Sequence, residues 1–454
     1  MPALDDGLPR ERLIPAVIAV CLAVGMATLD TAIVNTALPT MAVGLNTDSA
    51  SVIWVVNAYQ LVMVATILPF ASLGEVLGHR RVYLGGLWVF VLASLFCGLA
   101  WSLPSLAIAR VAQGLGAAAL MSVNAALLRF IYPSHMLGRG MGINSLVVGM
   151  SFTLGPTVAS AILSFASWHW LFLINVPIGV AAWWMARRNL PTLERSSHSY
   201  DRGAALLCSL LFGGLTLALT TGVHGVSPWL TVAELLLALA CGVALVRRQA
   251  GHPAPILAQD LYRRPLFALS SLTAVCSFCT QGLAFVSLPF MLQYQLGHSQ
   301  VATGYLITPW PAVVAVMALV AGRLSDRYPP GLLGGIGLLG LCLGMASLAL
   351  LQPGASAWDI GWRMALCGAG FGFFQSPNLK ALMTSAPPAR SGGASGVVAT
   401  SRLVGQTLGA SLVALCFHLS TTAGPQVALW LGCGFALVGA LASGLRLTGF
   451  GKGA

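Results

Sequence analysis

The chain is dominated by apolar runs of about twenty residues, the length of helix that crosses the hydrocarbon core of a bilayer. Hydrophobic residues fill 57% of its 454 positions and charged residues only 8%, whereas soluble proteins carry about a quarter charged residues. We therefore predict an all-α polytopic membrane protein. Division of the sequence at its polar loops predicts fourteen spans, near 13–38, 52–73, 82–100, 104–127, 140–165, 168–186, 203–222, 228–246, 266–290, 301–322, 331–351, 358–379, 393–417 and 424–445.

The basic residues support this number of spans. With the N-terminus inside, Lys and Arg are absent from every predicted outer loop, and they recur in every inner loop, from Arg80 and Arg81 to Arg446. A missed span would reverse all later loops, so the positive-inside rule predicts both termini in the cytoplasm and a multi-pass protein of the cytoplasmic membrane. The net charge of +11 is then a topology signal. Nucleic acid is not an expected partner, because no basic block or helical stripe is present.

The two ends of the chain resemble each other after a shift of 254 residues. Gly114 falls on Gly368, Asn124 falls on Asn378, and the "TLG" at 153–155 recurs at 407–409. Parallel six-helix repeats are a transporter architecture, with the substrate site at the midplane between the repeats. We predict an N-terminal six-helix bundle at 1–190, two inserted transmembrane helices with their loops at 191–262, and a C-terminal six-helix bundle at 263–454.

Two acids and one arginine inside predicted spans are our candidates for proton coupling. Asp30 lies near the centre of the first span, where a carboxylate is costly and usually functional. Arg110 lies about 9 Å into the fourth span, and we expect it to tune the proton affinity of Asp30; a purely structural salt bridge between the two is the alternative. Glu234 lies in the inserted pair. We predict that these residues couple transport to protons and bind a cationic substrate.

An acidic and basic motif lies in equivalent loops of the two repeats. The first copy, "LGEVLGHRR", joins spans two and three, and the second includes "LSDR". An acid near a helix end, followed by basic residues, can pair with a neighbouring helix terminus. We predict an inner-face gate, with ordinary topology charge as the alternative. Its residues are Glu75, Gly78, Arg80, Arg81, Asp326 and Arg327.

The chain resembles the fourteen-span drug:proton antiporters of the major facilitator superfamily, the group of quaternary-ammonium and multidrug efflux pumps. The resemblance rests on "LDTAIVNTALP" (29–39), "WVVNAYQL" (54–61), "RVAQGLGAA" (110–118), "WHWLFLINVPIG" (168–179) and "SYDRGAALL" (199–207). It implies the major facilitator fold with two additional helices. It also implies alternating access and export of a lipophilic, cationic drug in exchange for protons, with no cofactor beyond the proton gradient.

The family's span-five antiporter motif, Gly-x8-Gly-x3-Gly-Pro-x2-Gly, is matched in part. It occurs here as Gly142, Ser151, Gly155, Pro156 and Ala159. Two of its glycines are replaced by serine and alanine, which still allow helices to approach closely. We therefore expect antiport in preference to symport.

Aromatic and amide residues near the midplane are candidates for the cavity wall, because aromatic faces suit cationic ligands. Core packing is an equally good interpretation of each of them. Trp310 lies within "PWP", where we expect span ten to break. The candidates are Tyr59, Gln60, Gln113, Trp310, Phe374 and Gln375.

Two other function classes stay open at this point. A dedicated exporter of one endogenous metabolite or self-made antibiotic would share every feature above. A polytopic membrane enzyme is disfavoured, because no nucleophile, metal site or acid pair of the required spacing is found. The expected partners are a small-molecule drug, protons and the lipid bilayer, and the expected state is a monomer.

Overall fold

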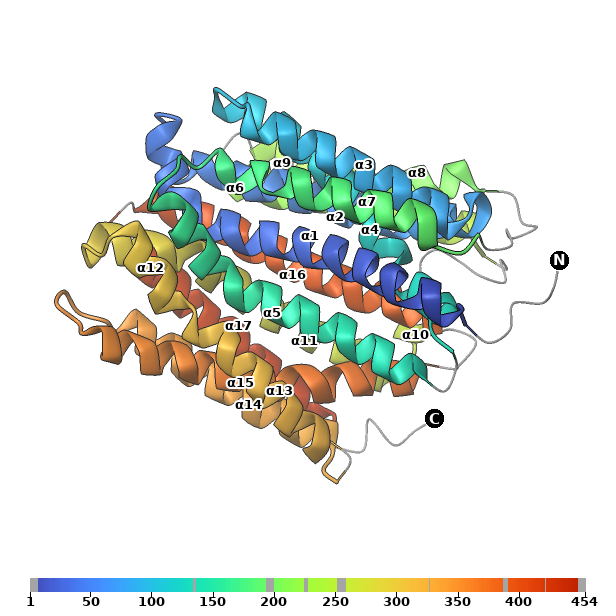
Figure 1. Ribbon diagram of the computed structural model, residues 1–454. Coiled ribbons are helices and arrows are strands. Elements are labelled where there is room, and N and C mark those ends of the chain that lie inside the picture. The colour runs from blue at the N-terminus through green and yellow to red at the C-terminus, as the bar shows by residue number, and fades with distance from the viewer. Residues whose placement is uncertain are drawn as a thin grey trace.

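The computed structural model describes residues 7–133, 136–192, 200–223, 228–250, 259–325, 327–386, 391–420 and 422–447. Within these ranges the regular structure is helical (Figure 1), which confirms the all-α fold. The chain begins with α1 (Arg10–Gly44), α2 (Trp54–Leu77), α3 (His79–Gly98), α4 (Leu103–Ile131), α5 (Leu137–Leu163), α6 (Trp170–Leu173) and α7 (Asn175–Asn189). It continues with α8 (Arg202–Val223), α9 (Pro228–Arg248) and α10 (Gln259–Tyr262). It ends with α11 (Pro265–Phe290), α12 (Gln300–Ile307), α13 (Pro309–Leu324), α14 (Pro330–Ala349), α15 (Ala357–Ser385), α16 (Ser391–Leu419) and α17 (Gly424–Leu445).

The helical segments have the lengths that the sequence predicted. Thirteen segments of the described chain are long and apolar enough to cross a membrane, with α6–α7 and α12–α13 each acting as one segment. α15 has 29 residues and is also long enough, although it is less apolar. The break in span ten is confirmed, because α12 ends at Ile307 and α13 begins at Pro309. Proline is tolerated in the first turn of a helix but disrupts an interior.

The helices before α8 pack mainly on one another, and so do those after α10. α1 lies against α5 and α7, and α4 against α2 and α3; later in the chain, α11 lies against α16 and α17, and α15 against α13 and α14. α8 contacts its neighbour α9 and also α2 and α16. α1 begins and α17 ends at the same end of the bundle (Figure 1). We call this end, which carries Arg80 and Arg187, the Arg-rich end, and the opposite end the Arg-poor end.

Gly114 and Gly368, which the sequence comparison aligned with each other, each bring two helices close together. A Cβ on Gly114 of α4 would lie 2.6 Å from the carbonyl oxygen of Tyr59 in α2. A Cβ on Gly368 of α15 would lie 2.2 Å from the carbonyl oxygen of Trp310 in α13. Helices approach this closely only where one residue lacks a side chain. The two contacts explain why α4 packs closely on α2 and α15 on α13.

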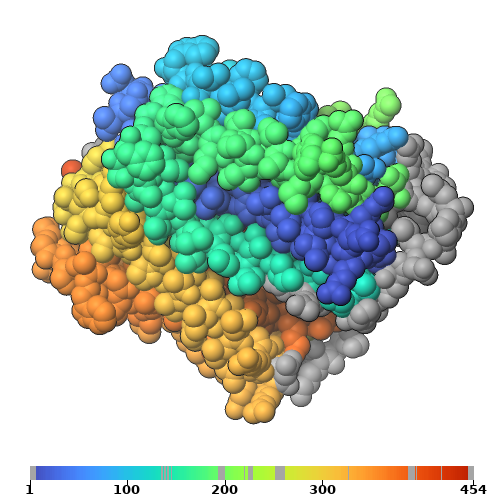
Figure 2. Space-filling model, viewed as in Figure 1, coloured from blue at the N-terminus to red at the C-terminus, as the bar shows by residue number. Residues whose placement is uncertain are grey.

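At the Arg-poor end, helices from the two groups are joined directly. Thr40 Oγ1 donates to Gln300 Oε1 at 2.7 Å, and Gln300 Nε2 donates to the carbonyl of Leu163 at 2.9 Å. Ser160 Oγ donates to the carbonyl of Gln300 at 3.1 Å. Figure 2 shows the side chains of α5, in teal, against those of α12, in yellow. The Arg-poor end is therefore closed where α1 and α5 meet α12.

Candidate functional site

A buried cluster of polar side chains surrounds Asp30, on α1. Arg110 Nη1 lies 2.6 Å from Asp30 Oδ2, which forms the ion pair between α4 and α1. Gln113 Nε2 and Asn175 Nδ2 donate to Asp30 Oδ1 at 3.0 and 2.8 Å. The exposed fractions are 0% for Asp30 and 1% for Arg110. A buried charge is tolerated where it is paired and hydrogen-bonded, and Asp30 meets both conditions.

Further contacts fix Arg110 in its position. Its Nε donates to the carbonyl of Val55 at 3.0 Å, and its Nη1 also donates to Gln113 Oε1 at 2.6 Å. Its guanidinium lies 4.1 Å from the centre of the Tyr59 ring, within cation–π distance. Gln113 also donates to Ser94 Oγ on α3. Helices α1, α2, α3, α4 and α7 thus meet in one hydrogen-bonded cluster.

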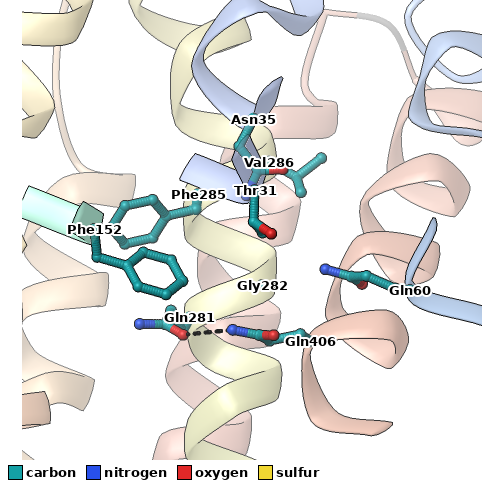
Figure 3. Close-up of a pocket in the computed structure, with 9 residues that line it drawn as sticks. All are labelled: Thr31, Asn35, Gln60, Phe152, Gln281, Gly282, Phe285, Val286 and Gln406. Atoms are coloured by element: carbon teal, nitrogen blue, oxygen red, sulfur yellow. Dashed lines mark hydrogen bonds between the residues drawn. The ribbon is translucent and has the colours of Figure 1, made fainter. Parts of the chain in front are cut away.

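A small pocket lies beside this cluster, between α1, α2, α5, α11 and α16. Figure 3 shows Phe152 and Phe285 among the residues that line this pocket, together with the amides of Gln60, Gln281 and Gln406. Gln406 Nε2 donates to Gln281 Oε1 at 3.1 Å. The pocket therefore offers an aromatic wall, formed by Phe152 and Phe285, and a set of amide groups.

A second pocket adjoins the first and shares Thr31, Gln60, Phe152 and Gln406 with it. Arg402 of α16 lines this second pocket, together with Tyr59. Tyr59 therefore links the second pocket to the buried cluster around Asp30. It touches Arg110 of the buried cluster through its ring and also forms part of the pocket wall.

The residues predicted for the cavity wall divide into two groups. Tyr59 and Gln60 line the pockets. Gln113 belongs instead to the cluster around Asp30. Trp310 and Phe374 are buried in an apolar core, where Trp310 packs edge-on against Phe285. Gln375 is partly buried and does not line either pocket.

Glu234 lies apart from the cluster around Asp30. It is partly buried on α9 and accepts a hydrogen bond from Thr221 of α8, within the pair of helices that precedes α10. This contact joins α8 to α9, and Glu234 is absent from the walls of both pockets.

The first loop motif holds helix ends together through its basic half. Gly78 has φ +97° between α2 and α3, a conformation that L side chains rarely adopt. Arg80 donates to the carbonyl of Arg187 at the end of α7 and to Thr192. Glu75 and Arg81 are exposed. In the second copy Arg327 is exposed, whereas Asp326 lies outside the described residues, and the gate stays a prediction.

The antiporter motif lies on α5 where this helix packs against α1 and α12. A Cβ on Gly155 would lie 2.3 Å from Ala32 Cβ of α1. A Cβ on Gly304 of α12 would lie 2.3 Å from the carbonyl oxygen of Pro156. Ala159 is fully buried, Ser151 lies beside Gly25 of α1, and Gly142 is in the first turns of α5. Small residues thus allow α5 to approach a helix on each side.

Three residues of the site were absent from the sequence prediction. Asn175 lies within a quoted motif, but its hydrogen bond to Asp30 depends on the packing of α7 against α1. Ser94 has no distinguishing signal in its sequence context. Arg402 carried the same signal as Asp30, a charge in the middle of an apolar run, and could have been found by that criterion.

Comparisons with known proteins agree with this architecture. Residues 20–410 match the family model described as the Major Facilitator Superfamily. The chain is 51% identical to an uncharacterized transporter, YebQ, of Escherichia coli K12, with 99% of each chain covered. It is 31% identical to the multidrug resistance protein Stp of Mycobacterium tuberculosis, over 92% of this chain and 78% of Stp. The solved structure of the POT family transporter PepTSo has the same fold, with a TM-score of 0.74 at 14% identity over 98% of this chain and 100% of that one. This chain is therefore a membrane transporter that belongs to the major facilitator superfamily.

Proposed function

We propose that this transporter exports amphipathic organic molecules across the cytoplasmic membrane in exchange for protons, by alternating access. The observation that carries the proposal is Asp30, a carboxylate removed from solvent and placed one side chain away from the pocket. Intramembrane acids of this kind mark proton pathways. The similarity to a protein named for multidrug resistance supports drug-like substrates.

The cluster suggests how a proton would act on the pocket. Protonation of Asp30 at Oδ2 removes the negative charge that holds Arg110 Nη1. Arg110 contacts the ring of Tyr59, so a shift of the guanidinium displaces a residue of the pocket wall. The antiporter motif and Gly304 lie where the two helix groups must separate for the Arg-poor end to open. Proton binding and opening are thus connected through α1, which contacts both Arg110 and α5.

Asp30→Asn tests the proposal. Asparagine has nearly the same shape and no charge, so we expect normal membrane insertion and loss of proton-driven export. The measurement is uptake of ethidium, a quaternary ammonium compound and an acidic drug into inverted membrane vesicles, with an uncoupler as reference. The matched control is Asp359→Asn at the Arg-poor end, which we expect to transport normally. Uncoupler-sensitive transport near the parental rate in Asp30→Asn would contradict the proposal.

The same panel of compounds separates broad export from a dedicated exporter. Cells that carry the gene are compared with cells that lack it for susceptibility to each drug. We expect reduced susceptibility to several unrelated compounds. Protection against none of the panel would favour the export of a single endogenous metabolite instead.

The proposed orientation places the Arg-rich end in the cytoplasm, together with both termini. We expect reporter fusions after Gly297, between α11 and α12, to report an external position. Fusions after Pro329, between α13 and α14, should report an internal one. Equal signals at the two positions would contradict the fourteen-span topology.

A further inference from the structure

Arg402 brings a positive charge to the pocket without an acid to balance it. It lies in the middle of α16, is partly buried and lines the pocket with Tyr59 and Gln60. The structure gives it no hydrogen bond or ion pair with another described residue, and its electrostatic neighbour is Tyr59. None of the residues that line the two pockets is an aspartate or a glutamate.

This position is unusual for an arginine that serves only packing or topology. α16 begins at Ser391, so Arg402 lies about 17 Å along the helix axis from the Arg-rich end. The apolar, membrane-length part of α16 begins at Gly396, so Arg402 lies about 9 Å inside it. Two other arginines within the described helices have acidic partners: Arg110 pairs with Asp30, and Arg363 pairs with Asp359. Arg446 donates to Ser270, Asn378 and Ser443.

The acid that would favour a cationic substrate is engaged elsewhere. Asp30 is fully buried, and both of its oxygens accept hydrogen bonds from neighbouring side chains. Asp30 and Arg110 together carry no net charge, so Arg402 leaves the region around the pocket positive. A cation entering this pocket would meet a like charge, which is costly where the dielectric constant is low.

We propose that the substrate carries an acidic group, such as a carboxylate or sulfonate, that pairs with Arg402. This inference rests on the proposed export function and replaces the cationic substrate expected from the sequence. The aromatic wall of Phe152 and Phe285 receives the apolar part of the molecule. Asn35 Oδ1 and Gln60 Oε1 are buried acceptors that accept no hydrogen bond from the described residues, and they suit N–H or O–H donors of the substrate.

An acidic substrate changes how exchange with protons must work. A cation and a proton would compete directly for one carboxylate. An anion at Arg402 does not compete with a proton at Asp30. Exchange then depends on the two conformations of the transporter, each of which favours one of the two ligands.

The test is equilibrium binding to the purified full-length transporter, which needs no proton gradient. The probes are 1-naphthoate, 1-naphthamide and 1-naphthylmethylammonium, which share one ring system and carry negative, zero and positive charge. We expect the parent to bind naphthoate most tightly. Arg402→Gln should weaken naphthoate binding by about 10- to 100-fold, the value of a charge-assisted hydrogen bond. Arg402→Lys should retain part of the affinity, because it keeps the charge but loses the planar fork.

The controls separate this inference from its alternatives. Arg263→Gln removes one exposed positive charge at the Arg-rich end and should leave naphthoate binding unchanged. Nanodiscs with and without phosphatidylglycerol show whether an anionic lipid occupies Arg402; equal naphthoate affinity in both supports a soluble acid. The inference is overturned if the parent does not bind naphthoate, if the ammonium probe binds as tightly, or if Arg402→Gln has no effect. Loss of proton coupling in vesicles, with naphthoate binding intact, would instead contradict only the export proposal.

Discussion

Gly304→Ala is expected to force the Arg-poor end open and to stop transport while the protein still folds. The new Cβ would lie 1.8 Å from Ser160 Oγ and 2.3 Å from the carbonyl oxygen of Pro156. The hydroxyl can rotate away, but a backbone carbonyl on a packed helix cannot, so α12 must move from α5. Overpacking of this kind costs about 1–3 kcal/mol, which lowers the ratio of closed to open molecules by about 5- to 150-fold.

Hydrogen–deuterium exchange followed by mass spectrometry measures this opening directly. Amides of α12 and of the Arg-poor part of α5 should exchange faster in Gly304→Ala than in the parent. Gly149→Ala is the matched control, because it adds the same methyl group to α5 where no atom lies within 4 Å. Unchanged exchange and full transport in Gly304→Ala would show that α5 and α12 do not form the closing contact.

Arg110→Ala is expected to be strongly destabilising. It leaves the Asp30 carboxylate buried with its amide donors but without its counter-ion. Removal of one partner from a buried ion pair costs about 3–5 kcal/mol. We expect poor accumulation in the membrane and a lower thermal midpoint in detergent, measured by the fluorescence of a thiol dye or by light scattering.

A second substitution shows whether the charge is the cause. Arg110→Ala combined with Asp30→Asn should recover most of the lost stability, since no unpaired charge remains. Arg363→Ala is the control, because its partner Asp359 is a third exposed and can be solvated. If the double variant is as unstable as Arg110→Ala, the loss comes from packing against Tyr59 and Phe172 and not from the charge.

The sequence was sufficient for the architecture because each predicted feature is local. A membrane span is recognised from about twenty consecutive residues, and the break in span ten is recognised from the "PWP" at Pro309. The partnership of Asp30 and Arg110 was also foreseeable, because isolated charges within lipid need each other. These properties depend little on how the helices are arranged.

The composition of the pocket was harder to predict. Gln113 and Gln60 are both amides near the midplane, yet one turns to Asp30 and the other to the pocket. The difference depends on the rotation of α4 and α2 about their own axes, which is set by contacts such as Gly114 with Tyr59. Trp310 and Phe374 have the composition of a binding wall but are packed in the core. Sequence periodicity distinguishes buried from exposed faces poorly in a helix that is apolar on all sides.

The position of α8 has a consequence for lipophilic compounds. Thr220 of α8 forms a 3.1 Å hydrogen bond with Ser411 of α16, while another part of α8 packs on α2. α2 belongs to the helix group before α8, and α16 belongs to the group after α10. α8 therefore lies across the lateral seam, the line on the side of the bundle where these two groups meet. α8 thus covers this seam and limits the access of acyl chains and membrane-dissolved compounds to it.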